Sequence, residues 1–132
     1  MIQITDDMKD VISKTRIFSV ATASPDNEPN VVPITFAKLI SDDEFLVMDN
    51  FMEKTEANLK ANPRMAISCW DINPQTKVAR AYQFKGCARF EDAGEIFDKG
   101  YQWVKSLMPQ INPKAAVIVK ITEVYNLEPH AH

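Results

Sequence analysis

Six runs of β-branched, aromatic and small apolar residues recur along this chain, and most of them are joined by only a few residues. They predict strands over residues 17–23, 30–40, 44–49, 64–71, 77–91 and 114–127. Helical patterns interrupt the series only over residues 6–14, 50–61 and 92–108. Short connections favour antiparallel pairing, because parallel neighbours need crossovers of about a dozen residues or more. The sequence therefore predicts a mainly β fold with peripheral helices, in which six antiparallel strands form a barrel.

Composition and charge narrow the class of protein. With 132 residues, 45% of them hydrophobic and 25% charged, the chain is expected to form one globular domain over residues 1–132. A net charge of −3 leaves no cationic excess to neutralise phosphates, which argues against nucleic acid as a partner. No membrane span and no secretory signal are recognisable, so a cytoplasmic protein is expected.

Two residues inside predicted strands have special backbone requirements. Pro33 lies within the second strand, and proline cannot donate to a ladder, so an edge or a bulge is expected there. Gly86 lies in the middle of the long fifth strand. It indicates a bend, or a point where another backbone or a ligand approaches closely.

The third strand runs directly into a helix that carries Lys54 and Thr55 near its start. Asn50 followed by Glu53 resembles a capping box and would begin this helix. A helix N-terminus presents free N–H groups and a partial positive charge. With a lysine and a hydroxyl added, it becomes a plausible socket for one phosphate group. The segment therefore predicts a phosphorylated cofactor.

No catalytic apparatus is recognisable elsewhere. The chain has no dinucleotide-binding glycine motif and no phosphate-binding loop. Its two histidines, His130 and His132, stand at the C-terminus and are not expected to bind a metal. Cys69 and Cys87 form no C-x-x-C motif and are expected to be reduced thiols. No catalytic residue and no metal ligand is therefore assigned, and any chemistry would belong to a bound cofactor.

Three segments together resemble the small FMN-binding split-barrel proteins of the pyridoxamine 5′-phosphate oxidase superfamily. They are residues 29–36, residues 52–64 and the aromatic-x-apolar-Lys-Gly-x-Ala run at residues 82–88. The likeness extends over about residues 10–125. It implies a six-stranded antiparallel split β-barrel that binds FMN in a groove at the subunit interface of a homodimer.

The resemblance also implies which residues meet the cofactor. Lys54 and Thr55 would hold the phosphate of FMN, and the second strand would run beside the flavin ring. The full implied set is Pro33, Ile34, Thr35, Asp49, Asn50, Lys54, Thr55 and Gln83, the last at the cofactor or the dimer contact. The chain lacks the arginine-rich substrate segment and the C-terminal extension of the full oxidases, so oxidation of pyridoxamine phosphate is not expected.

The function expected on these grounds is that of an FMN flavoprotein, an oxidoreductase or an electron-transfer protein. Its partners would be small donors and acceptors, NAD(P)H among them. Four alternatives stay open at this point: a flavin carrier or sensor without turnover, a barrel that has lost its cofactor, a deazaflavin-binding barrel and a haem-binding barrel of the same superfamily. Haem would require an axial ligand in the groove, and the two histidines are poorly placed for that role.

Overall fold

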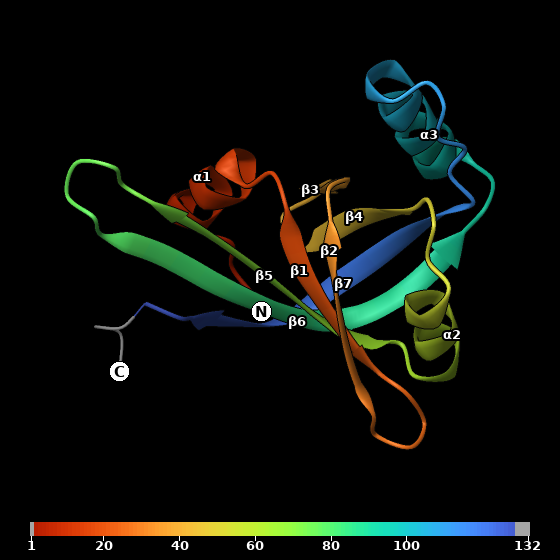
Figure 1. Ribbon diagram of the computed structural model, residues 1–132, viewed down its shortest axis with the longest axis horizontal. Helices are drawn as coiled ribbons and strands as arrows, with labels where there is room; N and C mark the ends of the chain where they lie inside the picture. The colour runs from red at the N-terminus through yellow and green to blue at the C-terminus, as the bar shows by residue number, and fades with distance from the viewer. Residues whose placement is uncertain (1, 129–132) are drawn as a thin grey trace.

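The computed structural model describes residues 2–128 and contains one curled, wholly antiparallel sheet that forms a half-barrel (Figure 1). The strand order is β2-β1-β5-β6-β7-β4-β3. The strands are β1 (Phe18–Ala23), β2 (Pro29–Ile34), β3 (Ala37–Leu39), β4 (Glu44–Asp49), β5 (Arg64–Ile72), β6 (Ala79–Glu91) and β7 (Ala115–Asn126). The helices are α1 (Asp6–Lys14), α2 (Lys54–Ala61) and α3 (Glu95–Leu107). The predicted fold class is confirmed, with seven strands in place of six.

The additional strand arises because the run predicted over residues 30–40 is divided. Its first part, β2, pairs with β1, whereas its second part, β3, pairs with β4 at the opposite end of the strand order. Only Thr35 and Phe36 separate the two strands in the chain. Pro33 lies on β2, an edge strand, as its missing N–H predicted. Pairing with β1 stops one residue later, at Ile34, and the chain crosses to the other edge.

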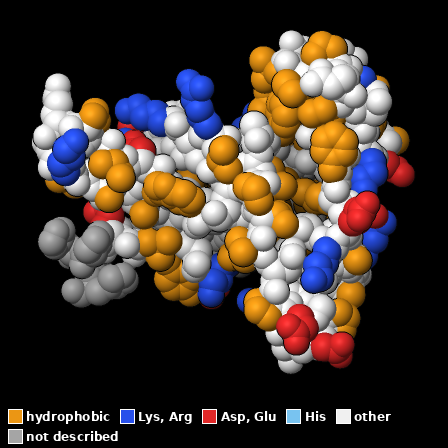
Figure 2. All heavy atoms as spheres, in the orientation of Figure 1, with side chains coloured by type: hydrophobic (Ala, Val, Ile, Leu, Met, Phe, Trp, Pro, Cys, Tyr) orange, Lys and Arg blue, Asp and Glu red, His pale blue; other side chains and the backbone are white. Residues whose placement is uncertain are grey.

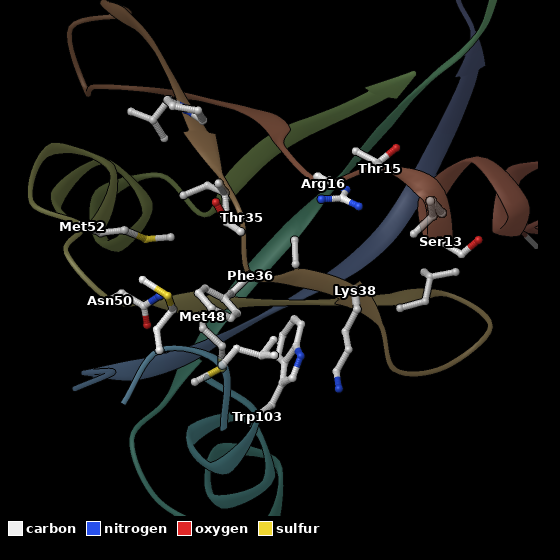
Figure 3. Close-up of a pocket in the computed structure, with 18 of the residues that line it drawn as sticks. Ser13, Thr15, Arg16, Thr35, Phe36, Lys38, Met48, Asn50, Met52 and Trp103 are labelled. Carbon is white, nitrogen blue, oxygen red and sulfur yellow. The ribbon is translucent and has the colours of Figure 1, made fainter. Parts of the chain in front are cut away.

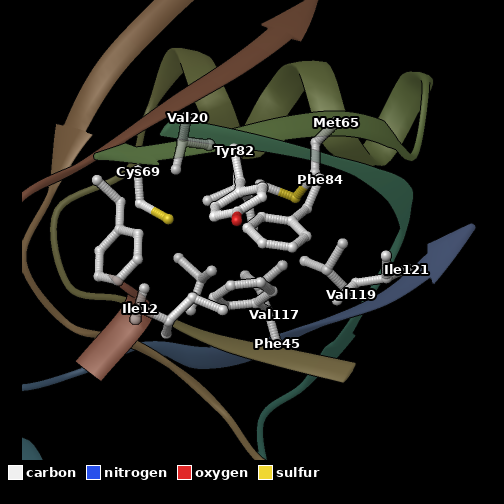
Figure 4. Packing of buried hydrophobic residues seen from close by; sticks show 14 of the residues in the cluster. Ile12, Val20, Phe45, Met65, Cys69, Tyr82, Phe84, Val117, Val119 and Ile121 are labelled. Atoms are coloured by element: carbon white, nitrogen blue, oxygen red, sulfur yellow. The ribbon is translucent and has the colours of Figure 1, made fainter. Parts of the chain in front are cut away.

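Alternate residues of the strands fill the inside of the half-barrel. Met65 and Cys69 of β5 and Tyr82 and Phe84 of β6 are buried there and alternate with more exposed residues (Figure 4). The Phe45 and Phe84 rings lie with their centroids 5.3 Å apart in the same cluster. Because buried side chains fill this interior, a tricyclic ligand has no room inside the barrel.

A second, smaller core lies on the outer face of β4 and β7. Leu46, Met48 and Ile118 point out of the barrel and pack against α3 through Val104. Residues 115–119 of β7 are therefore buried on both faces, whereas a strand with one buried face would show alternation. The reason is that α3 covers the face that would otherwise meet water; Figure 1 shows the helix standing outside the sheet.

Gly86 marks a close approach between two strands. A Cβ at this position would collide with the backbone carbonyl of Lys120 on β7. The pairing between β6 and β7 also shifts register between Lys85 and Gly86, which is the signature of a β-bulge. Both predictions made from the mid-strand glycine, a bend and a close backbone contact, are confirmed.

Helix α1 is fastened to the sheet by Arg80 of β6. The guanidinium contacts Asp7 and Asp10 of α1 at 2.9 Å each, and Asp71 of β5 at 2.5 Å. The Tyr82 hydroxyl donates to Asp7 as well, and burial, followed by this bond, raises the pKa of Tyr82 to about 12. These contacts hold α1 against β5 and β6.

Candidate ligand-binding site

A cavity of about 1160 Å³ lies outside the barrel core, along the crossing between β2 and β3 (Figure 3). It extends from the start of α2, past Thr35 and Phe36, to the C-terminal end of α1. Ligand pockets in proteins usually enclose about 300–1,000 Å³. The cavity is therefore large enough for a nucleotide-sized cofactor, with space left over.

The middle of the cavity is apolar and flat-sided. Phe36, Met48 and Trp103 form this part of its wall. The Phe36 and Trp103 rings meet edge to face, with centroids 5.3 Å apart and an interplanar angle of 83°. Lys38 Nζ lies 4.2 Å from the centroid of the Trp103 ring, a cation–π distance. Such a wall favours a planar aromatic ligand.

The end of the cavity beside α2 carries polar groups. Asn50, Met52 and Thr55 line it. Asn50 Oδ1 is buried and accepts no hydrogen bond from the described residues. An unsatisfied buried acceptor is costly, so this atom is a natural partner for a donor on a ligand.

Thr55 is held by a buried polar network. Its hydroxyl accepts a hydrogen bond from Asn30 Nδ2 at 3.1 Å. Asn30 also donates to Thr22 Oγ1 at 3.2 Å, and Asn58 Nδ2 donates to the same oxygen at 3.1 Å. These bonds join α2 to β1 and β2, so the network fixes the cavity wall at Thr55.

The start of α2 differs from the prediction. The helix begins at Lys54, and Glu53 at the N-cap makes no side-chain hydrogen bond, so the capping box expected between Asn50 and Glu53 is wrong. Asp49 accounts for the difference, because its Oδ1 accepts from Met52 N at 3.0 Å and shapes the connection ahead of the helix. No side-chain cap therefore occupies the N–H groups of the first turn.

Asp49 also interacts with Lys114 and Glu56. Its side chain is fully buried, and Lys114 Nζ lies 3.6 Å from its Oδ1 and 3.0 Å from Glu56 Oε2. Burial, followed by the hydrogen bond with Glu56, raises the pKa of Asp49 to about 6. Hydrogen bonds from Asp49 and then from Lys114 lower the pKa of Glu56 to about 2. Lys114 thus contacts both carboxyl groups, and Lys60 contacts Glu56 as well.

The eight residues predicted to meet the cofactor fall into two groups. Five line the cavity: Pro33, Ile34, Thr35, Asn50 and Thr55. Three do not. Asp49 is fully buried and does not reach the cavity, and Lys54 is the exposed first residue of α2. Gln83 lies on the outer face of β6, opposite Ser68 and Tyr125, on the side away from the barrel core.

The sequence prediction missed two sets of lining residues. Helix α3 and the segment after it contribute Trp103, Leu107, Met108 and Ile111, and the opposite end of the cavity contains Arg16 and Lys38. Aromatic residues at helical spacing usually belong to a core or an interface, so the sequence position of Trp103 does not indicate a place in a ligand cavity. Leu107 and Met108 are 62% and 39% exposed. These apolar side chains are therefore not fully covered by the packing of α3 on the sheet.

Known proteins with a similar sequence or fold support the family that the sequence resembles. The profile of the pyridoxamine 5′-phosphate oxidase family matches residues 4–128. The uncharacterized protein MJ0282 of Methanocaldococcus jannaschii is 35% identical, over 97% of this chain and 83% of its own. HupZ of Group A Streptococcus is 26% identical with a TM-score of 0.82, over 98% of this chain and 96% of its own. An FMN-binding protein of Syntrophomonas wolfei has a TM-score of 0.80 at 18% identity, over 91% of this chain and 83% of its own.

Other barrels with this fold carry different cofactors in their names. They include an FAD-binding protein, an F420 reductase and a haem storage protein. Each is less than 25% identical to this chain, so the likeness establishes the fold alone.

Two further features bear on the class of site. Within residues 2–128, no helix is both long and apolar enough to cross a membrane. In the same part of the chain, no group of three or more histidine, cysteine, aspartate or glutamate residues is arranged to hold a metal ion. His130 and His132 lie outside the described residues. Cys69 and Cys87 are both free.

Proposed function

The chain belongs to the pyridoxamine 5′-phosphate oxidase family, and on that basis we propose that it is a flavoprotein that holds FMN in the cavity beside α2. The observation that carries the proposal is the shape and lining of this cavity. It joins an uncapped helix start to an apolar, flat-sided channel outside the barrel. FMN has a phosphate on a short chain attached to a planar ring. The phosphate would lie at the helix start, and the ring would lie in the apolar channel.

The residues at the α2 end would hold the phosphate. The N–H groups of the first turn of α2 have no side-chain cap, and the helix dipole places partial positive charge there. Lys54 forms no ion pair with any of the described residues, so its ammonium is available. Lys54 would supply a mobile charge, and Thr55 would fix the wall through its bond to Asn30.

The β2–β3 crossing would hold the ring. Pro33, Ile34 and Thr35 lie along one side of the cavity, where β2 is an edge strand. Asn50 Oδ1 would accept a hydrogen bond from a donor on the flavin or its ribityl chain. When bound, FMN supplies hydride or single-electron transfer, and the chain contributes binding, orientation and exclusion of water.

A second copy of the chain is the proposed cover of the cavity. Phe51, Leu107 and Met108 line it and are 75%, 62% and 39% exposed. Figure 2 shows hydrophobic side chains gathered over α3, beside the cavity. Exposed apolar residues clustered around a ligand pocket are typical of a surface that another protein covers. A homodimer would bury them and shield the ring from solvent.

The experiment is an absorbance spectrum of the purified protein, followed by titration with FMN, F420 and haemin. We expect FMN to bind, with a band near about 450 nm, and NADH or NADPH to bleach it under anaerobic conditions. Binding without bleaching would favour the carrier or sensor alternative. Tighter binding of F420, with absorbance near about 420 nm, or of haemin would contradict the assignment of FMN. Residues 2–128 contain no histidine, which disfavours haem.

A further inference from the structure

Lys114 connects separate parts of the chain immediately ahead of α2. It is the last residue of the segment that joins α3 to β7, beside the end of β4 (Figure 1). Its backbone N–H donates to Asp49 O at 2.7 Å, and its ammonium donates to Met52 O at 2.5 Å. The side chain therefore links the start of β7 to the short connection between β4 and α2.

The same ammonium lies between two carboxylates. Lys114 Nζ is 3.0 Å from Glu56 Oε2 and 3.6 Å from Asp49 Oδ1. Lys60 is the second cation of this cluster and contacts Glu56 Oε1 at 3.0 Å. Among residues 2–128, Lys114 is the only cation that contacts Asp49, whose side chain is fully buried. A buried carboxylate that loses its cation is strongly destabilised, so Asp49 depends on Lys114 for neutralisation.

These contacts fix the backbone that leads into the α2 end of the cavity. Asp49 Oδ1 accepts from Met52 N at 3.0 Å, so Met52 is held at its N–H by Asp49 and at its carbonyl by Lys114. α2 begins at Lys54, two residues later, without a side-chain cap. Met52 and Thr55 line the cavity, whereas Lys114, within the described part of the chain, is not in its wall. Lys114 thus acts on the site through the residues that it holds.

We propose that Lys114 is a positioning residue for the binding of a phosphate ester at the start of α2. It fixes the connection ahead of the helix through Met52 O. It also offsets the negative charges of Asp49 and Glu56, which would otherwise repel the phosphate. The phosphate itself would contact the N–H groups of α2 and Lys54. The inference rests on the proposed function for the identity of the phosphate ester, FMN.

The test compares FMN with riboflavin in fluorescence titrations of Lys114→Met, which keeps a long side chain and removes its charge. We expect the affinity for FMN to fall about tenfold or more at pH 8, and that for riboflavin to change less than about twofold. Lys105→Met is the matched control. Lys105 anchors the same α3–β7 segment through Pro109 O at 3.0 Å and lies outside the Asp49 cluster, so both affinities should stay unchanged.

A pH profile separates positioning from a general loss of structure. The charged groups that face Asp49 are Lys114 and Glu56, with Lys60 beyond Glu56. Burial, followed by the hydrogen bond with Glu56, raises the pKa of Asp49 to about 6, so Asp49 is largely protonated at pH 5 and ionised at pH 8. The loss of FMN affinity in Lys114→Met, relative to wild type, should therefore be larger at pH 8. The titration of the phosphate itself cancels in this ratio.

Asp49→Asn removes the charge that Lys114 neutralises. In this background, Lys114→Met should weaken FMN binding less than it does in the wild-type chain, and by the same factor at pH 5 and pH 8. If Lys114→Met alone does not fold, FMN and riboflavin are compared in the Asn background. A selective loss for FMN would then support the proposal, and equal losses would refute it.

Three results would overturn the proposal: a loss of FMN affinity that does not depend on pH, equal losses for FMN and riboflavin, or the same loss in Lys105→Met. If the wild-type chain binds neither flavin, the proposed function fails, and the variants are compared by calorimetry with inorganic pyrophosphate. An affinity for pyrophosphate that depends on Lys114 would support the positioning role, and its absence would refute it.

Discussion

Lys54 is the residue on which the phosphate assignment can be tested most directly. It is exposed at the first residue of α2, next to Thr55 in the cavity wall. Lys54→Ala should weaken FMN binding by about 1.5–3 kcal/mol, the usual contribution of a charged hydrogen bond. Riboflavin has no phosphate, so its affinity should not change; fluorescence titration measures both. The control is Lys60→Ala in the last turn of the same helix. Equal losses for FMN and riboflavin would remove Lys54 from the phosphate site.

Asp49 should make stability depend on pH in a specific window. Its pKa is about 6 in the folded chain against 3.8 for the free side chain, so the folded state holds the proton more tightly. The contribution of Asp49 to stability is therefore complete below about pH 4 and is lost as the pH rises through 6. Glu56 acts in the opposite sense, since its pKa is lowered to about 2, and its contribution is lost as the pH falls below about 4.5.

Asp49→Asn separates the two effects. The amide resembles the protonated acid and can still accept the hydrogen bond from Met52 N. We expect the decrease in unfolding free energy between pH 4 and 6 to disappear in the variant, a change of about 1–2 kcal/mol. Urea denaturation at pH 4, 5, 6 and 7 measures it. An unchanged slope between pH 4 and 6 would show that Asp49 titrates normally.

Single residues could be predicted well where the backbone set the requirement. Pro33 and Gly86 have one backbone property each that sequence reveals directly, and both lie where that property is needed. Competing side chains were harder to foresee. Asn50 and Glu53 have the spacing of a capping box, but the Asp49 carboxylate takes the nearby donor and the helix starts later. Gln83 stands between the inward-facing Tyr82 and Phe84, so strand alternation alone already placed it outside.

At the level of elements, the contact between β6 and β7 should tolerate no side chain at Gly86. Gly86→Ala would push a methyl group into the Lys120 carbonyl, and two paired backbones cannot move apart cheaply. We expect a loss of about 3 kcal/mol or more in unfolding free energy, measured by urea denaturation. Gly100→Ala is the comparison, because its methyl group meets the end of the flexible Met48 side chain and should cost less. Equal losses would mean that the β6–β7 contact is not rigid.

The existence and type of most elements followed from local pattern, whereas their partners did not. The alternation in β5 and β6 reflects a barrel with one buried face, which a sequence shows directly. The burial of residues 115–119 on both faces depends on α3, an element that packs there only after the chain has folded. The division of the predicted strand 30–40 has the same origin. Pro33 indicated an irregularity, but only barrel closure decides that β3 joins β4.

For the whole molecule, the exposed apolar rim of the cavity predicts association. We expect a dimer in sedimentation velocity, with twice the 15.0 kDa mass of the chain, and a melting temperature that rises with protein concentration and with added FMN. Phe51→Asp should shift the protein toward the monomer and weaken FMN binding together, because Phe51 is 75% exposed at the rim. Val78→Asp, remote from the cavity in the β5–β6 connection, is the control. A monomeric wild-type chain would contradict the proposed cover.

The two-residue link between β2 and β3 has a consequence for the motions of the sheet. These strands are the two free edges of a seven-stranded sheet, yet the chain itself ties them together at Thr35 and Phe36. Any breathing that unrolls the half-barrel must strain this tie, which also forms part of the cavity wall. A molecule seated against Thr35 should therefore slow amide hydrogen exchange in β2 and β3 simultaneously, and exchange followed by mass spectrometry would detect it. Protection of one edge without the other would show that the edges open independently.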